Sequence, residues 1–315
     1  MMNKKPIFKN DYPPGHLRTL VLSYFVDWVI VALLALGFFL VDKIPPFHRL
    51  FSLENKTISF PHKQFDTIPM SLAFILVFVI PLVLMALISL LIRRSPYDCH
   101  NAILGLCLSM TLTLMITHVL KVTVGRHRPD FISRCQPMKE NGLDRVDPPL
   151  GLTSVDVCTQ TDAYVFLDGM KSFPSGHTSL SFAGLTFFSL YLAGKLHLFD
   201  ERGHTYKSFV TVAPMIGAAL IAVSRICDYR HHWQDVLVGA FIGVSCAYFS
   251  YRQYYPHLGS PRCHKPFSPR IPRPIAKQLD LPEISSEEWM RMEGVTVTGT
   301  DTTKQSSEGL SLSPQ

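Results

Sequence analysis

Runs of apolar residues long enough to cross a membrane constrain this chain more than any other feature. The hydrocarbon core of a bilayer is about 30 Å thick, so a spanning helix needs about 20 mostly apolar residues. Six runs are candidates: Thr19–Val41, Met70–Ile92, Ala102–Val122, Thr178–Leu196, Phe209–Val223 and Trp233–Tyr251. We therefore predict an all-α fold, a six-span transmembrane helical bundle. The fifth run is short, and a buried or re-entrant helix is the alternative interpretation for it.

Composition agrees with a membrane protein. Only 17% of the 315 residues are charged and 47% are hydrophobic, whereas roughly 25% of residues are charged in a soluble domain. Lysine and arginine exceed the acidic residues by six. They form no dense basic patch interleaved with aromatic residues, so we expect no nucleic-acid partner. The seven cysteines lack C-x-x-C spacing, which argues against a zinc site or a disulfide scaffold.

The apolar runs divide the chain into three parts. Residues 1–18 are basic, which favours a cytosolic N-terminal segment. Residues 19–255 contain the six predicted spans. Residues 256–315 are rich in Pro, Ser and Thr and lack apolar periodicity, so we expect a largely disordered cytosolic tail. The protein is thus expected to be an integral, multi-pass membrane protein.

Two features of the predicted extracytoplasmic loops remain undecided by the sequence. Asn55 begins an N-x-[ST] sequon in the first such loop, and it either carries a glycan or does not. Cys135 and Cys158 lie in the loop between the third and fourth spans. In an oxidising compartment they either form a disulfide or remain two free thiols.

Three polar stretches lie at the ends of apolar spans. They run from Lys121 to Pro129, from Pro174 to His177 and from Ser224 to Asp235. Counting spans places the exit of the third, the start of the fourth and the junction of the fifth and sixth on one membrane face. With a cytosolic N-terminus, that face is lumenal or extracytoplasmic.

Cations in these stretches can bind a phosphoryl group. Lys121 and Arg128 are seven residues apart, which on a continuous helix is about two turns and one face. With Arg225 they would form a clamp, because the planar guanidinium binds phosphate oxygens bidentately. Ser175 and Gly176 precede a helix, whose free N–H groups attract anions. The alternative is that the cations only anchor helix ends to lipid headgroups.

Two histidines at the same depth suggest catalysis. His231 and Asp235 are four residues apart and share a face if helical. The carboxylate could then accept from one ring nitrogen and leave the other free to attack. His177 could protonate the leaving oxygen. We interpret His232 as structural, and Asp27 and His118 as partners in interhelical hydrogen bonds.

The combined pattern resembles the signature of the type 2 phosphatidic acid phosphatase superfamily, the lipid phosphate phosphatases. That signature is K-x6-R-P, P-S-G-H and S-R-x5-H-x3-D, and every position is met. The matching residues are Lys121, Arg128, Pro129, Pro174, Ser175, Gly176, His177, Ser224, Arg225, His231 and Asp235. The chain looks most similar to the branch that includes diacylglycerol pyrophosphate phosphatase.

The resemblance implies a core shared with haloperoxidases and a metal-independent phosphatase that needs no cofactor. His231 would form a phosphohistidine, His177 would act as the acid and Asp235 would orient His231. Lys121, Arg128, Ser175, Gly176 and Arg225 would hold the phosphoryl oxygens. The expected partner is a phospholipid substrate in the bilayer: phosphatidate and related lipid phosphates, with diacylglycerol pyrophosphate as a second substrate.

Three alternatives remain: a phosphatase for a soluble sugar phosphate, a non-catalytic lipid-phosphate-binding protein, and a haloperoxidase, which six spans disfavour. The sequence does not rank the lipid substrates, fix the oligomeric state or choose among the vacuole, Golgi and endoplasmic reticulum membranes.

Overall fold

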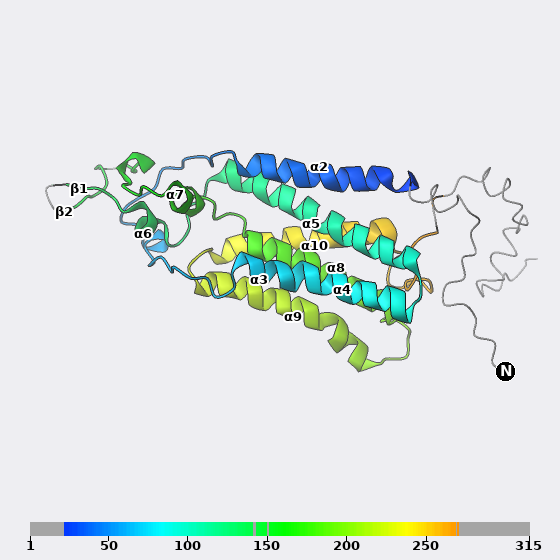
Figure 1. Ribbon diagram of the computed structural model, residues 1–315. Helices are drawn as coiled ribbons and strands as arrows, with labels where there is room; N and C mark the ends of the chain where they lie inside the picture. Colours follow the sequence, from blue (N-terminus) through cyan, green and yellow to red (C-terminus); the bar gives the residue numbers. More distant parts are fainter. Residues whose placement is uncertain (1–21, 141–142, 150, 269, 271–315) are drawn as a thin grey trace, which may run out of the picture.

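Long helices run side by side and carry a cap of short elements at one end (Figure 1). The computed structural model describes residues 22–140, 143–149, 151–268 and 270. The long helices are α2 (Phe25–Asp42), α5 (Pro96–Val124), α8 (Gly176–Lys195), α9 (Thr205–Cys227) and α10 (Trp233–Tyr254), together with a composite rod over Met70–Ile92. The cap contains α6 (Phe131–Cys135), α7 (Ala163–Gly169), the 3₁₀ turns Lys56–Ile58 and Val155–Val157, and the paired strands β1 (Lys139–Glu140) and β2 (Leu143–Asp144). The predicted all-α class is confirmed, since these strands have two residues each.

Four of the helical rods are long and apolar enough to cross a membrane: α2, Met70–Ile92, α5 and α9. The fifth predicted run is therefore one continuous helix of 23 residues, α9, rather than a short segment. Helices α8 and α10 have 20 and 22 residues but lower hydropathy. Much of α8 is buried, so protein rather than lipid surrounds it and polar residues are tolerated there. The count of six spans stays a prediction for α8 and α10.

The rod over Met70–Ile92 changes helix type around its proline. It consists of α3 (Met70–Phe74), a π-helical turn at Ile75–Val79, α4 (Ile80–Leu87) and a second π-helical turn at Ile88–Ile92. Pro81 lies in the first turn of α4. Proline has no N–H and clashes with the carbonyl four residues earlier. A wider turn just before Pro81 accommodates both effects, and the rod continues past the proline instead of ending.

Close packing of α8 against α10 brings two of the polar stretches together. A Cβ added at Gly243 of α10 would lie 2.3 Å from the carbonyl oxygen of Ser179 on α8, and one at Gly239 would lie 2.8 Å from that of Ser175. Only glycine permits such an approach. The N-termini of α8 and α10, where His177 and Asp235 lie, therefore occupy one end of the bundle.

Helix α2 lies at the edge of the bundle against α5 (Figure 1). Polar contacts fix both of its ends. Asp27 accepts a hydrogen bond from Tyr254 of α10 (3.2 Å) and pairs with Arg270 (3.0 Å). Asp42 pairs with His118 of α5 at 3.2 Å. The predicted interhelical hydrogen bond is thus confirmed for Asp27, whereas Nδ1 of His118 has the ion-pair contact with Asp42 but no hydrogen bond.

The residues after α10 pack against the end of the bundle that is remote from the cap. Cys263 is buried, and the ammonium group of Lys195 donates to the carbonyl of His264 (2.7 Å). Lys195 also pairs with the buried Asp98 at 2.6 Å. Part of the stretch 256–268 thus packs against the bundle, and the start of the tail at 256 stays a prediction. Residues 271–315 and the predicted segment 1–18 lie outside the described residues.

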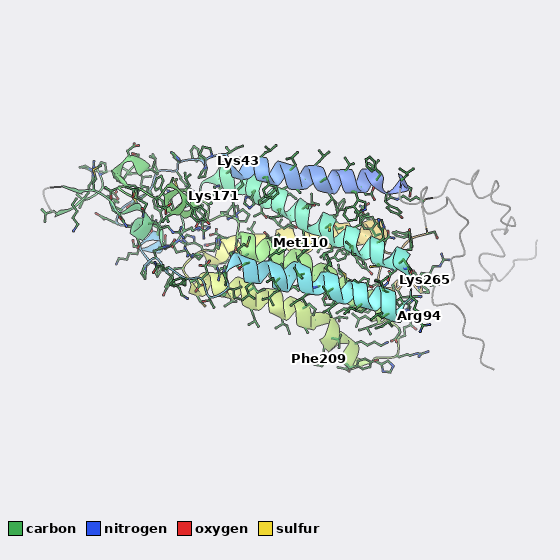
Figure 2. All side chains as sticks on the ribbon, in the orientation of Figure 1. Lys43, Arg94, Met110, Lys171, Phe209 and Lys265 are labelled. Carbon is green, nitrogen blue, oxygen red and sulfur yellow. A yellow bond between two sulfur atoms is a disulfide. The ribbon has the colours of Figure 1, made fainter. Side chains whose placement is uncertain are left out.

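Basic side chains lie at both ends of the bundle, and exposed apolar side chains lie between them. Figure 2 shows Lys43 and Lys171 at the cap end, and Arg94 and Lys265 at the opposite end. Large apolar side chains are exposed along the helices between these ends, for example Leu36, Ile80, Leu220 and Phe241. An exposed apolar band of this kind fits a lipid environment.

Candidate active site

A cavity of about 990 Å³ lies at the cap end of the bundle, and the three polar stretches meet there. Six of the predicted site residues line it: Lys121, Arg128, Gly176, His177, Arg225 and His231. Ser175 and Asp235 lie behind its wall and are fully buried. The histidines therefore open onto one space, as a shared phosphate requires.

The first stretch leaves its helix before it reaches Arg128. Helix α5 ends at Val124, and Gly125 adopts a left-handed φ of 57°. A Cβ at Gly125 would lie 1.8 Å from the carbonyl oxygen of Phe47, so glycine is required there. Arg128 thus lies in a loop, and the expected continuous helix from Lys121 to Arg128 is wrong. Both residues nevertheless line the cavity.

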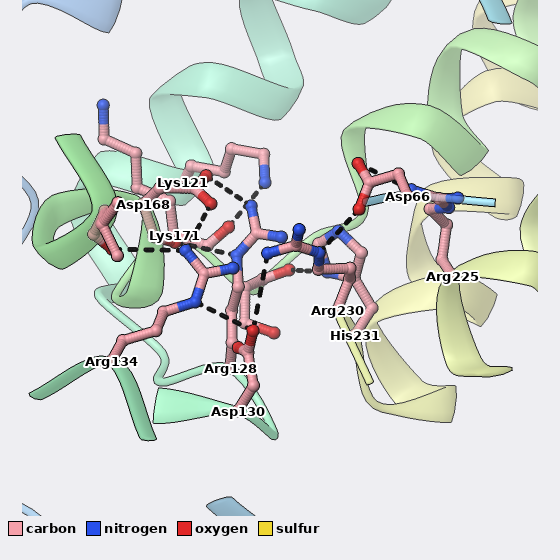
Figure 3. Close-up of polar contacts among 12 residues, drawn as sticks. Asp66, Lys121, Arg128, Asp130, Arg134, Asp168, Lys171, Arg225, Arg230 and His231 are labelled. Carbon is pink, nitrogen blue, oxygen red and sulfur yellow. Dashed lines mark hydrogen bonds and ion pairs between the residues drawn. The ribbon is translucent and has the colours of Figure 1, made fainter. Parts of the chain in front are cut away.

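Carboxylates hold the predicted phosphate-binding arginines in place (Figure 3). Arg128 donates to the side chain of Asp168 (2.6 Å) and to its backbone carbonyl (2.8 Å). Arg225 donates to Asp228 (2.8 Å) and pairs with Asp66 (3.3 Å). Burial alone would raise the pKa of Asp168, but Arg128 and Arg134 lower it to about 2. Asp168 is therefore ionised and fixes its arginines.

The N-terminus of α8 presents Gly176 and His177 to the cavity. The side chain of Ser175 caps this helix and accepts from the backbone N–H of Thr178. The backbone N–H of Ser175 donates to the backbone carbonyl of Asp235 (3.0 Å). Direct phosphate binding, as predicted for Ser175, therefore does not follow from its position. The first N–H groups of a helix have no intrahelical partner, so Gly176 and His177 offer donors to an anion.

His231 has a defined protonation pattern. Its Nδ1 lies 2.7 Å from the backbone carbonyl of Ser172. A carbonyl oxygen can only accept, so Nδ1 carries the proton and Nε2 of the neutral ring keeps a lone pair. Burial, then the charges of Arg128 and Lys121, lower the pKa of His231 well below its ordinary value. The ring is therefore held neutral with Nε2 available.

Asp235 does not accept the main hydrogen bond of His231. Its carboxylate lies 3.9 Å from Nδ1. It accepts instead from the Ser172 hydroxyl (2.6 Å), from Arg126 (2.7 Å) and from the backbone N–H of His232 (3.0 Å). The expected shared helical face is wrong, because α10 begins at Trp233 and His231 precedes it. Asp235 therefore reaches His231 through Ser172.

Several residues of the site have no motif of their own in the sequence. Ser172 and Arg126 lie between the predicted positions but look like ordinary loop residues. The others belong to separate segments or neighbour the signature without being part of it: Asp66, Asp130, Arg134, Asp168, Lys171 and Arg230. Figure 3 shows most of these side chains joined by hydrogen bonds and ion pairs around Arg128. For these residues the sequence offers one signal, the high density of charged residues in the loops that border the spans.

A disulfide fixes the cap beside the cavity. Cys135 at the end of α6 is bonded to Cys158, and their Cα atoms are 4.6 Å apart. Of the two interpretations left open by the sequence, the structure has the disulfide. Within the described part of the chain, no group of three or more His, Cys, Asp and Glu side chains could hold a metal ion.

Comparisons with known proteins place the chain among phosphatases that act on lipids. Residues 102–258 match the profile of the PAP2 superfamily. The chain is 42% identical to lipid phosphate phosphatase 2 of Arabidopsis thaliana over 77% of its own length and 81% of that protein. It is 36% identical to diacylglycerol pyrophosphate phosphatase 1 of Saccharomyces cerevisiae over 70% of its own length and 76% of that protein. No solved structure matches the chain.

Proposed function

The chain belongs to the PAP2 superfamily and is a membrane lipid phosphatase, and we propose that it hydrolyses phosphatidate and diacylglycerol pyrophosphate. The names of its relatives indicate this substrate class. A cavity at the end of an apolar bundle suits a lipid whose phosphate enters the site while its acyl chains stay in the bilayer. The cations that line the cavity supply the charge that such a headgroup needs.

In the proposed first step, Nε2 of His231 attacks phosphorus. A P–N bond forms, and the P–O bond to the leaving group breaks. His177 gives its proton to the leaving oxygen. In the second step, water attacks the phosphohistidine, the P–N bond breaks and His177 takes a proton from that water. Inorganic phosphate is released and both histidines return to their starting state.

Lys121, Arg128, Arg225 and the N–H groups at the start of α8 would stabilise the negative charge of the transition state. Donors held in place before the reaction need no reorganisation during it. Asp168 and Asp228 supply that rigidity, because each binds one of the arginines. Since these cations already provide the positive field, we propose that the reaction needs no metal ion.

One observation carries the proposal: buried polar atoms beside the cavity lack hydrogen-bond partners in the protein. Nε2 of His177 is buried without a hydrogen bond, and Nη1 of Arg225, also buried without one, has only an ion-pair contact with Asp66 at 3.3 Å. Leaving such groups unsatisfied costs about 1–3 kcal/mol each, and more when they are charged. A phosphate placed against His231 can satisfy both atoms.

Trapping the phosphoenzyme tests the proposal. Purified protein is mixed with phosphatidate carrying ³²P in its phosphate and quenched in alkali, which preserves phosphohistidine. We expect label on the wild type and on a His204→Ala control, an exposed histidine that does not line the cavity. His231→Ala should carry no label and release no phosphate. Label on His231→Ala would refute the assigned nucleophile.

The same preparation separates the alternative functions. Hydrolysis of glucose 6-phosphate in preference to phosphatidate would favour a soluble sugar phosphate as substrate. Binding of phosphatidate without turnover would favour a non-catalytic protein. We expect full activity in EDTA and inhibition by vanadate, which resembles five-coordinate phosphorus; strict dependence on Mg²⁺ would refute the metal-free mechanism.

A further inference from the structure

We propose that Arg134 binds the second phosphoryl group of a diphosphate substrate, next to the phosphoryl group that His231 attacks. This inference rests on the proposed function and extends it to substrate choice. Arg134 lines the cavity but belongs to no part of the signature. It lies in α6, directly before the disulfide-bonded Cys135.

One carboxylate holds Arg134 beside Arg128. Oδ1 of Asp168 accepts from Nη2 of Arg128 at 2.6 Å, and Oδ2 accepts from Nη1 of Arg134 at 2.8 Å. The two guanidinium groups are therefore separated by the width of a single carboxylate (Figure 3). Two phosphoryl groups joined by a bridging oxygen are also immediate neighbours. If Arg128 holds the terminal phosphoryl group, Arg134 lies where the inner one is expected.

Arg134 has a donor to spare. Its Nε donates to Asp130 (2.9 Å) and its Nη1 to Asp168, while Nη2 is buried without a hydrogen-bond partner. The side chain is only 2% exposed. An arginine that merely supported the cap would be expected to satisfy all its donors, since an unpaired buried charged donor is costly. Nη2 therefore points to an anionic ligand rather than to a protein partner.

The charge of the cavity also favours a diphosphate. Six cationic side chains line it, namely Lys121, Arg128, Arg134, Lys171, Arg225 and Arg230, against three carboxylates, Asp42, Asp66 and Asp168. The lining therefore has a formal charge of +3. A phosphate monoester carries about −1.5 to −2 at neutral pH. The second phosphoryl group of a diphosphate adds a further negative charge, which Arg134 can bind.

Arg134 would then act during bond cleavage as well as in binding. Nε2 of His231 attacks the terminal phosphorus, a P–N bond forms, and the bond from that phosphorus to the bridging oxygen breaks. The electron pair remains on the bridging oxygen, so charge builds up on the inner phosphate, and His177 supplies a proton. Arg134 stabilises that charge. With phosphatidate the leaving oxygen carries no phosphate, and this contact is lost.

Substrate selectivity tests the proposal. In mixed micelles, kcat/KM is measured for diacylglycerol pyrophosphate and for phosphatidate with full-length wild type, Arg134→Lys and Arg134→Gln. We expect both variants to lose at least tenfold more activity on the diphosphate than on the monophosphate. Arg134→Lys keeps the positive charge but loses the rigid planar guanidinium group, which can donate two parallel hydrogen bonds to a phosphate. Arg145→Gln is the matched control: this exposed arginine is in the same cap but outside the cavity lining, and should keep the wild-type ratio.

Equal losses on the two lipids would overturn the proposal and leave Arg134 a structural role. Melting temperature and an intact Cys135–Cys158 bond show whether Arg134→Gln folds. If it does not fold, the ratio of kcat/KM on the two lipids for Arg134→Lys tests the proposal. Inhibition gives a second readout: methylenediphosphonate should lose more potency than inorganic phosphate against Arg134→Lys, and equal shifts would refute the inference. Failure of the wild type to hydrolyse either lipid would instead refute the proposed function.

Discussion

Ser172 contacts both His231 and Asp235, through different atoms. Its carbonyl accepts from Nδ1 of His231, and its hydroxyl donates to Asp235. The backbone contact survives any substitution of the side chain, whereas the hydroxyl contact does not. Asp235 can therefore position the nucleophile through the segment that Ser172 occupies, besides its contact with the N–H of His232.

We predict that Ser172→Ala lowers kcat about tenfold, which corresponds to about 1.4 kcal/mol of barrier. The carbonyl still orients His231, but it is no longer held by Asp235. KM should change little, because Ser172 does not line the cavity. Steady-state kinetics on phosphatidate measure this split, and Ser172→Thr, which keeps the hydroxyl, should restore most of kcat. A rise in KM with unchanged kcat would argue against a positioning role.

The pH dependence of phosphoenzyme formation should report the neutral state of His231. Burial and nearby cations lower its pKa below the ordinary 6.5, so the ring stays unprotonated and nucleophilic as the pH falls through that value. On the acid side, the single-turnover rate should decline at a pH below 6.5, when Nε2 becomes protonated; any decline on the alkaline side would instead report loss of the proton that His177 donates. Rapid-quench measurements from pH 4 to 8 test this. A midpoint of that decline at or above 6.5 would contradict the effect of burial and nearby cations on the pKa of His231.

Sequence alone predicted the signature residues of the site but not their partners. Spacing and span counting placed Lys121, Arg225 and both histidines on one face. Asp168 and Ser172 could not be predicted, because their contacts depend on how the loop between α5 and α8 folds back. Asp235 was predicted with the wrong contact, since four-residue spacing was read as helical while α10 begins only after His231.

At the scale of elements, hydrophobic runs predicted the helices better than their ends. Polar residues extend α5 and α9 beyond the apolar ranges at their N-termini. For α5 the cause is Ser95, whose side chain accepts from the N–H of Asp98 (3.2 Å) and starts the helix at Pro96. Hydropathy carries no information about such caps. It also gave no sign of α6 and α7, which are short and depend on the disulfide and ion pairs around them.

The contact between α8 and α10 gives a prediction about glycine. Gly243→Ala places a methyl group 2.3 Å from a backbone carbonyl, so the helices must separate. We expect the free energy of unfolding to fall by about 1–3 kcal/mol and kcat to fall with it. Gly217→Ala in α9 is the control, since its Cβ would meet only Leu185 at 3.8 Å. It should be neutral or stabilising by about 0.5–1 kcal/mol; equal melting temperatures would contradict the packing argument.

At the scale of the whole molecule, the cavity lies at the end of the bundle opposite Arg94 and Lys265 (Figure 2). The basic N-terminal segment led to the proposal that the cavity faces the lumen or the cell exterior. Exposed acidic residues mark the two ends: Glu54 in the loop before the second span and Glu201 between α8 and α9. These positions should differ in their access from the cytosol.

Cysteine labelling tests this orientation. In a Cys227→Ser background, which removes an exposed thiol, Glu54→Cys and Glu201→Cys are treated with an impermeant maleimide in sealed vesicles whose cytosolic face is outward. Glu201→Cys should react at once, and Glu54→Cys only after detergent is added. The reverse pattern would place the cavity in the cytosol. Reaction of both from outside would contradict the spanning arrangement itself.

The polar contacts at the two ends of α2 have a consequence for how the protein tolerates change. Asp42 borders the cavity and binds His118 and Lys171, while Asp27 secures the distant end. Substitutions on the lipid-exposed face of this helix leave the contacts of Asp27 and Asp42 unchanged and should have little effect on stability or activity. A neutral residue at position 42 would instead loosen the helix where it forms the rim of the reaction chamber.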